Sequence, residues 1–208
     1  GCEPMSLYHH HASKARLLHE CVETTLAEAR AWTVAGVAAK GLSMDAPHAF
    51  EEWAGGPMTT VRNVRLLAEM LDEIAKTGKP PLDESRFSTS RDGVTQVRVF
   101  PNSAMDKALY AGITANVRMQ KGMSAADVRA KAGSFYATKD PEGHVSLVLG
   151  AGNVGSIAPM DALYKMFVEG SVCLVKMNPV NEYLEPHYVR ALEPLVDAGY
   201  LRFVRGGG

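Results

Sequence analysis

The segment VSLVLGAGNVG, residues 145–155, determines the fold that we expect. It begins with an uninterrupted apolar run that is typical of a buried strand. The pattern G-x-G-x-x-G follows at Gly150, Gly152 and Gly155, and a predicted helix comes directly after it. In this setting glycine permits a tight turn, and the helix N-terminus offers N–H donors to a phosphate. The pattern predicts nucleotide binding at these three glycines. The alternative is a glycine-rich turn that is needed only for packing.

Strands and helices alternate from this segment to the C-terminus. The predicted elements are a helix over residues 160–169, a strand over 172–175, a helix over 185–198 and a strand over 200–204. Apolar strands that alternate with helices predict a Rossmann-like parallel βαβαβ unit, with right-handed crossovers and helices on both faces of the sheet. Gly206–Gly208 comes directly after the last predicted strand. We therefore expect a further element to follow in a longer protein.

Toward the N-terminus the hydrophobic period is first that of helices and then that of strands. The predicted elements are helices over residues 13–40 and 59–76, strands over 87–91, 94–100 and 113–119, and a helix over 124–136. Asp92-Gly93 is a strong signal for a β-hairpin between the first two strands. Phe50 and Trp53 lie between the two long helices, and we expect both rings to pack in the core.

The predicted fold is an α/β protein with three regions. Residues 1–82 form a helical N-terminal region, and residues 83–140 form the hairpin with a connecting strand and helix. Residues 141–208 form the first part of a nucleotide-binding α/β domain. The length of 208 residues is enough for one large domain or two small ones.

Composition argues against several classes of function. The net charge of −1 argues against a dedicated nucleic-acid binder. No apolar run is long enough to cross a bilayer, so no membrane partner is expected. Cys2, Cys21, Cys173 and the seven histidines show no metal-ligand spacing, so no metal site is predicted. Free thiols favour a cytoplasmic location, and Cys173 is expected to be buried and inert within its strand.

The end of the second predicted strand departs from the usual dinucleotide-binding pattern. That pattern has an Asp or Glu there to bond the ribose hydroxyls, whereas this chain has Lys176. A lysine could pair with a 2′-phosphate or donate to the ribose hydroxyls. The segment Asn178–Asn181 is interpreted first as a helix-initiating turn and second as a ligand contact, and Asn178 is retained as a cofactor-binding candidate.

These departures match a different pattern. The segment from Val145 to Gly207 resembles the start of the cofactor domain of the aldehyde dehydrogenase superfamily. It looks most like a divergent bacterial branch that is distantly akin to acyl-CoA reductases. The matching features are Asn153 followed by Pro159, then Leu174-Val175-Lys176, then a helix and the strand after Gly199. The preceding 140 residues fit only loosely.

The resemblance implies NAD(P)-dependent oxidation of a small-molecule aldehyde, or reduction of an acyl thioester. Asn153 would be catalytic, its amide stabilising the oxyanion of the intermediate. Lys176 would bond the adenosine ribose, and Glu182 could replace an acidic partner that the family places where Pro179 stands. NAD and NADP remain alternatives. The nucleophilic cysteine, the general-base glutamate and the glycine motif that holds the pyrophosphate would lie beyond residue 208.

The resemblance also implies a homo-oligomer, and a projecting hairpin at residues 87–100 would suit such an assembly. Two other functions stay open. One is a non-catalytic nucleotide-binding or interaction module, favoured by the missing nucleophile. The other is an ordinary Rossmann dehydrogenase, favoured by the intact glycine pattern and disfavoured by Lys176.

Overall fold

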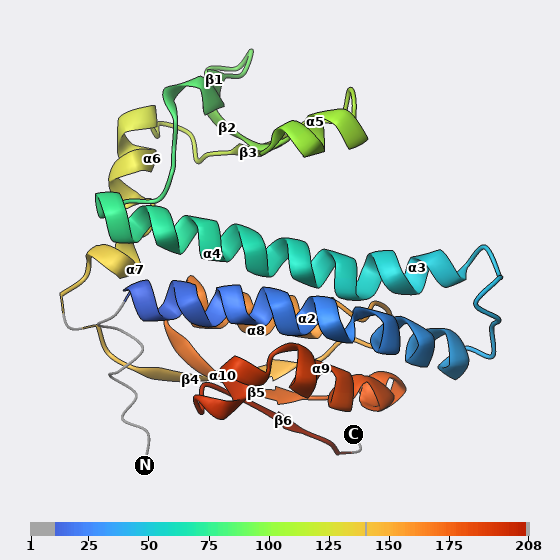
Figure 1. Cartoon of the computed structure of the whole chain (residues 1–208). Helices are drawn as coiled ribbons and strands as arrows, with labels where there is room; N and C mark the ends of the chain where they lie inside the picture. The colour runs from blue at the N-terminus through green and yellow to red at the C-terminus, as the bar shows by residue number, and fades with distance from the viewer. Residues whose placement is uncertain (1–10, 140, 207–208) are drawn as a thin grey trace.

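The computed structural model describes residues 11–139 and 141–206 as a parallel sheet, a layer of helices and a small antiparallel lobe. Figure 1 shows helices α2 and α4 side by side above the parallel sheet, with the lobe on the far side of α4. The class is therefore mixed α/β with a helical N-terminal region. No helix in these two ranges is long and apolar enough to cross a membrane.

The N-terminal helices agree closely with the helical hydrophobic period. They are α2 (His11–Ala39), α3 (Ala49–Trp53), the π-helical segment η1 (Ala54–Met58) and α4 (Thr59–Thr77). Helix α4 ends where Gly78 adopts a φ of 75°, a left-handed conformation that favours glycine. The predicted helices over 13–40 and 59–76 are confirmed, and the structure adds α3 and η1 in front of the second.

The antiparallel lobe follows α4. Its elements are η2 (Glu84–Arg86), β1 (Phe87–Thr89), β2 (Thr95–Phe100), α5 (Ala104–Leu109), β3 (Ala115–Arg118), α6 (Ala125–Lys131) and α7 (Ser134–Ala137). The strand order is β1-β2-β3. The hairpin at Asp92-Gly93 is confirmed, with strands shorter than predicted and Gly93 at a φ of 80°. The single helix predicted over 124–136 is wrong, because Gly133 takes a left-handed conformation and divides it.

The C-terminal third forms the predicted parallel unit. Its elements are β4 (His144–Leu149), α8 (Ile157–Phe167), β5 (Ser171–Lys176), η3 (Pro179–Leu184), α9 (Glu185–Ala191), α10 (Glu193–Asp197) and β6 (Leu201–Val204). The strand order is β4-β5-β6, and both pairs are parallel. The helix predicted over 185–198 is divided at Leu192 because Pro194 lacks the N–H that an unbroken helix needs. Helix α8 begins earlier than predicted, with Pro159 tolerated in its first turn.

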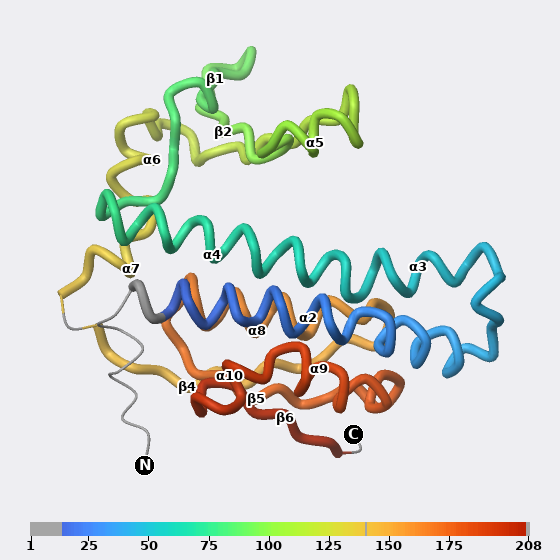
Figure 2. The backbone as a smooth tube through the Cα atoms, in the orientation of Figure 1, coloured from blue at the N-terminus to red at the C-terminus, as the bar shows by residue number. Residues whose placement is uncertain are grey.

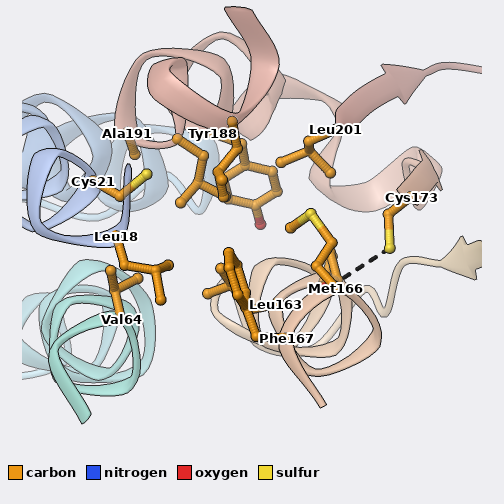
Figure 3. Close-up of a cluster of buried hydrophobic side chains, with 14 of the residues drawn as sticks. Leu18, Cys21, Val64, Leu163, Met166, Phe167, Cys173, Tyr188, Ala191 and Leu201 are labelled. Carbon is orange, nitrogen blue, oxygen red and sulfur yellow. Dashed lines mark hydrogen bonds between the residues drawn. The ribbon is translucent and has the colours of Figure 1, made fainter. Parts of the chain in front are cut away.

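One hydrophobic core joins the N-terminal helices to the parallel sheet. Leu18 of α2 and Val64 of α4 belong to the same buried cluster as Leu163 of α8, Tyr188 of α9 and Leu201 of β6. Figure 3 shows these side chains pointing toward one another from separate elements. The predicted division into residues 1–82, 83–140 and 141–208 stays a prediction, but the first and third of these regions share this core.

The parallel sheet is covered on one face only by the described residues, which corrects the expectation of two covered faces. Val148 of β4 and Cys173 of β5 point into the core. Leu147, which pairs with Leu174 of β5, points to the other face of the sheet and is 62% exposed. Val145 and Leu149 of the same strand are exposed as well. The strands lie in sequence order, and the buried sides of α8, α9 and α10 all join the same core cluster. Both crossovers therefore pass over the same face of the sheet.

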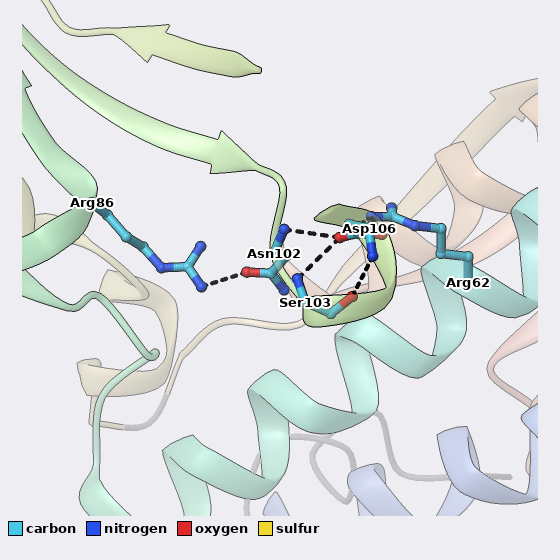
Figure 4. A network of polar contacts seen from close by, with 5 residues as sticks. All are labelled: Arg62, Arg86, Asn102, Ser103 and Asp106. Atoms are coloured by element: carbon cyan, nitrogen blue, oxygen red, sulfur yellow. Dashed lines mark hydrogen bonds and ion pairs between the residues drawn. The ribbon is translucent and has the colours of Figure 1, made fainter. Parts of the chain in front are cut away.

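A network around Asp106 attaches the antiparallel lobe to α4 (Figure 4). The Asp106 carboxylate accepts hydrogen bonds from Arg62 Nη2 at 3.1 Å and from the backbone N–H groups of Asn102 and Ser103 at 2.8 and 3.2 Å. Figure 2 shows the backbone of the lobe on the side of α4 that faces away from the parallel sheet. Arg62 therefore forms an ion pair that links the lobe to α4.

Ionisation of Asp106 should make the stability of the lobe depend on pH. Burial tends to raise the pKa of Asp106, but the Asn102 N–H and the Arg62 guanidinium outweigh it and lower that pKa. A carboxylate whose pKa is lowered in the folded state stabilises the fold at pH values above its unfolded-state pKa of about 3.9. This stabilisation is lost as the pH falls through the folded-state pKa. We expect Asp106→Asn to reduce the free energy of unfolding by about 1–2 kcal/mol at pH 7.

The measurement is urea unfolding of both proteins between pH 7 and pH 2.5. The difference between them should shrink as the pH falls toward 2.5, because protonation of the native Asp106 removes its charge. Asp127→Asn is the matched control, because Asp127 forms the same capping box with Ser124 on the exposed surface. A difference that stays constant with pH would contradict the role given to the charge.

Candidate functional site

The carboxyl edge of the parallel sheet gathers the predicted site residues. Strand β4 ends at Leu149 and leads into the glycine turn, while β5 ends at Lys176. Strand β6 ends at Val204, so Gly206 lies at the same edge. Ligands of open parallel sheets bind outside this edge. Asn153, Lys176 and Asn178 are therefore at the edge where a ligand is expected.

The three glycines of the turn are in close contact with other parts of the chain. The Gly150 N–H donates to the Lys176 carbonyl at 2.9 Å, and a Cβ on Gly150 would lie 3.1 Å from that oxygen. A Cβ on Gly152 would lie 2.9 Å from Asn178 Oδ1, and one on Gly155 would lie 3.2 Å from Leu184. None of the three has a positive φ. Glycine is needed here for close approach within the protein, which supports the packing alternative for this turn.

The start of helix α8 has few donors left for an anion. The Ser156 N–H donates to the Gly55 carbonyl of η1 at 3.0 Å, and the Ile157 N–H donates to the Val154 carbonyl at 3.3 Å. Pro159 has no N–H at all. A helix N-terminus binds phosphate through unpaired N–H groups, and most of those in this first turn are paired or absent.

Two side chains that sequence reasoning missed hold the turn in place. The buried Asn181 amide donates to the Ala151 carbonyl at 3.0 Å, and the Tyr188 hydroxyl donates to the Gly155 carbonyl at 2.6 Å. Burial raises the pKa of Tyr188, so its hydroxyl stays protonated. Asn178 caps η3 by accepting from the Val180 N–H at 3.0 Å, which is the helix-initiating role considered first for it. No local pattern singles out Asn181 or Tyr188 for these contacts, because the carbonyls that they bond lie 30 and 33 positions away in the sequence.

Lys176 and Glu182 both lie beside Gly206. A Cβ on Gly206 would lie 3.9 Å from Lys176 Cε, and the Gly206 N–H donates to Glu182 Oε1 at 3.3 Å. Both side chains are half-buried, and Lys176 makes no ion pair within residues 11–139 and 141–206. An ammonium and a carboxylate at one strand edge can together bond the two hydroxyls of a ribose, the lysine as donor and the glutamate as acceptor. Of the expected cofactor contacts, this pair fits a nucleotide best, while the inner side of the glycine turn does not.

Asn153 occupies the outer side of the turn. The residue is exposed, and its amide forms no hydrogen bond within the described part of the chain. Its neighbour Val154 contacts the η1 segment, where a Cβ on Gly55 would lie 3.4 Å from Val154 Cγ1. The amide is therefore available to donate to a ligand oxygen.

The two described cysteines are poor nucleophiles. Burial raises the pKa of Cys21 to about 12 and that of Cys173 to about 11, so both thiols stay protonated near neutral pH. Cys173 is buried in its strand, as expected. Cys2 lies outside the described residues. In the described ranges, no three His, Cys, Asp or Glu side chains gather to hold a metal ion.

A scan against models of known protein families and a search of curated proteins both find no match for the chain. The resemblance to the aldehyde dehydrogenases therefore stays a prediction from the residues quoted for it.

The contact between Gly152 and Asn178 can be tested by adding one methyl group. We expect Gly152→Ala to reduce the free energy of unfolding by about 1–3 kcal/mol, because the new Cβ overlaps the Asn178 amide. In an Asn178→Ala background the same change should cost clearly less, since the overlapping atoms are gone. Chemical denaturation of the four proteins measures this.

Gly55→Ala is the matched control, because its Cβ would make only an ordinary contact with Val154. It should unfold close to the wild type. A Gly152→Ala variant as stable as the wild type would mean that the turn is not packed against Asn178.

Proposed function

We propose that the chain is the cofactor-binding start of an NAD(P)-dependent oxidoreductase that acts on an aldehyde or an acyl thioester. In this proposal Lys176 and Glu182 hold the adenosine ribose of the coenzyme at the carboxyl edge of the sheet. When bound, the coenzyme accepts or delivers a hydride. The thiolate and the general base come from elsewhere in the protein, because Cys21 and Cys173 are buried as thiols.

The observation that carries the proposal is the position of Lys176 and Glu182 around Gly206. The resemblance implied a lysine on the ribose and left its acidic partner uncertain. The geometry supports Glu182 as that partner. A carboxylate near the ribose disfavours a 2′-phosphate by charge repulsion, so the proposal favours NAD over NADP.

The packed glycine turn argues against the alternative of an ordinary Rossmann dehydrogenase. That alternative needs the pyrophosphate against the glycines and the helix N-terminus, where Asn178 and the Gly55 carbonyl already lie. The aldehyde dehydrogenase pattern places the pyrophosphate on a later motif and leaves this turn to present an asparagine. Asn153, exposed on the outer side of the turn, is the proposed oxyanion donor. The free thiols of Cys21 and Cys173 also suit a cytoplasmic location.

Titration of the chain with NAD, NADP and ADP-ribose by calorimetry tests this proposal. We expect Lys176→Met to weaken NAD binding by about tenfold or more, because a hydrogen bond from a charged donor contributes about 1.5–3 kcal/mol. Glu182→Gln should weaken NAD binding and should raise the affinity for NADP relative to the affinity for NAD. Asn153→Ala should leave both affinities unchanged, since its proposed role is on the substrate.

Lys165→Met is the matched control, because Lys165 pairs with Glu169 at 2.6 Å near the far end of α8. It should bind NAD like the wild type. Absence of binding by NAD and NADP at millimolar concentration would refute the proposal and favour a non-catalytic interaction module. Binding that survives Lys176→Met would place the nucleotide elsewhere.

We further propose that the protein is a homo-oligomer whose contact lies on the antiparallel lobe. Met105, Leu109 and Ile113 are exposed there, and β3 is an edge strand whose residues are all exposed. Exposed apolar side chains beside an open strand edge are typical of an interface. These residues follow the predicted hairpin rather than forming its tip.

The double variant Leu109→Asp/Ile113→Asp should lower the mass measured by light scattering to that of one chain. Charges on the contact would be buried without partners, which an interface does not tolerate. Leu147→Asp, on the open face of the parallel sheet, should leave the mass unchanged. A wild-type mass of one chain, or an unchanged mass in the double variant, would contradict this contact.

A further inference from the structure

Phe50 and Trp53 of α3 are exposed, although the sequence analysis expected both in the core. Phe50 is 64% exposed and Trp53 is 40% exposed, and their ring centroids lie 5.4 Å apart. Leu26 of α2 and Met44 of the α2–α3 loop are exposed beside them. Exposed apolar side chains gathered in one place mark a binding surface more often than scattered ones do.

These side chains line a hollow between the second half of α2, the loop after it and α3. The hollow has a volume of about 640 Å³ and is largely open to solvent. Most of its lining is apolar, and Trp53 and Phe50 form part of its wall. An apolar hollow of this size gains free energy from a ligand that removes the rings from water.

The polar groups of the hollow define the chemistry of the occupant. The Thr33 hydroxyl already donates to the Ala29 carbonyl at 2.8 Å. Arg30 is the charged side chain in the lining, and it makes no ion pair within the described ranges. A guanidinium beside apolar walls matches a ligand with one anionic head and an apolar body, and its planar fork suits a carboxylate.

We propose that this hollow binds an unbranched alkyl carboxylate, with the chain against Leu26, Phe50 and Trp53 and the carboxylate on Arg30. The proposal does not rest on the nucleotide function, because none of the residues that line the hollow belongs to the pair Lys176 and Glu182. It assigns the exposed aromatic pair of α3 to ligand binding.

Tryptophan fluorescence of the full chain reports the binding directly. The chain has two tryptophans, and Trp32 is buried in the core while Trp53 lines the hollow. Octanoate, decanoate and dodecanoate are titrated below their micelle concentrations, with calorimetry in parallel. Each added methylene should tighten binding by about three- to fourfold, which corresponds to about 0.8 kcal/mol per buried group. Trp53→Phe should abolish the fluorescence change while calorimetry still detects binding.

The head group is tested with a variant and a neutral ligand. Arg30→Gln should weaken decanoate binding by about tenfold, because a hydrogen bond from a charged donor is lost, and should leave the affinity for 1-decanol unchanged. Arg16→Gln is the matched control, because Arg16 lies on the same helix but pairs with Glu20. It should behave as the wild type.

Several results would overturn the proposal. They are absence of saturable binding, equal affinity for all chain lengths, equal affinity of decanoate and decanol in the wild type, or a lowered unfolding temperature with decanoate. Saturating NAD should leave the decanoate affinity unchanged. Failure of nucleotide binding with intact decanoate binding would remove the proposed function alone.

Discussion

The contact between α2 and α9 is the interaction on which the rest of the structure depends. Pro194 divides the predicted C-terminal helix, and the Leu195 N–H then donates to Leu192 rather than to Ala191. The Ala191 carbonyl, buried at the broken end, instead accepts from the hydroxyls of Thr24 and Thr25 at 2.7 and 3.0 Å. A buried carbonyl without a donor would cost about 1–3 kcal/mol, so the threonines of α2 and the break in the helix stabilise each other.

This contact between α2 and α9 places the N-terminal helices next to the glycine turn. Trp32 of α2 is buried between η1 and the turn, where a Cβ on Gly56 or Gly155 would lie 3.0 or 3.3 Å from its indole nitrogen. The Gly55 carbonyl binds the Ser156 N–H from the same side. The inner side of the turn therefore belongs to the core. A ligand could therefore contact the outer side of the turn and the side chains at the ends of the strands.

Local rules predicted much of the fold, and long-range contacts account for most of what they missed. The hydrophobic period gave the long helices and the parallel strands, and Asp92-Gly93 gave the hairpin. The helical hydrophobic period continues across Pro194, and a single helix was therefore predicted there. The proline by itself indicates a break in that helix, because it has no backbone N–H to donate. Alternation of strands and helices does not say on which face each crossover passes, so the open face was not foreseen. The pairing of Arg62 with Asp106 joins residues 44 positions apart, and no local pattern contains it.

The glycine pattern itself explains why site prediction was weaker than fold prediction. The same spacing occurs whether glycine makes room for a phosphate or for the protein's own atoms, because both need the absence of a Cβ. What distinguishes them is the atom that fills the vacant space, and at Gly152 that atom belongs to Asn178. In the proposal of nucleotide binding, recognition falls to charged side chains at the sheet edge, and Lys176 was visible in the sequence because it stood where an acid was expected. Glu182, the acidic partner proposed for Lys176, was harder to assign from sequence, since it lies in η3 and meets the sheet edge only through its contact with Gly206 after β6.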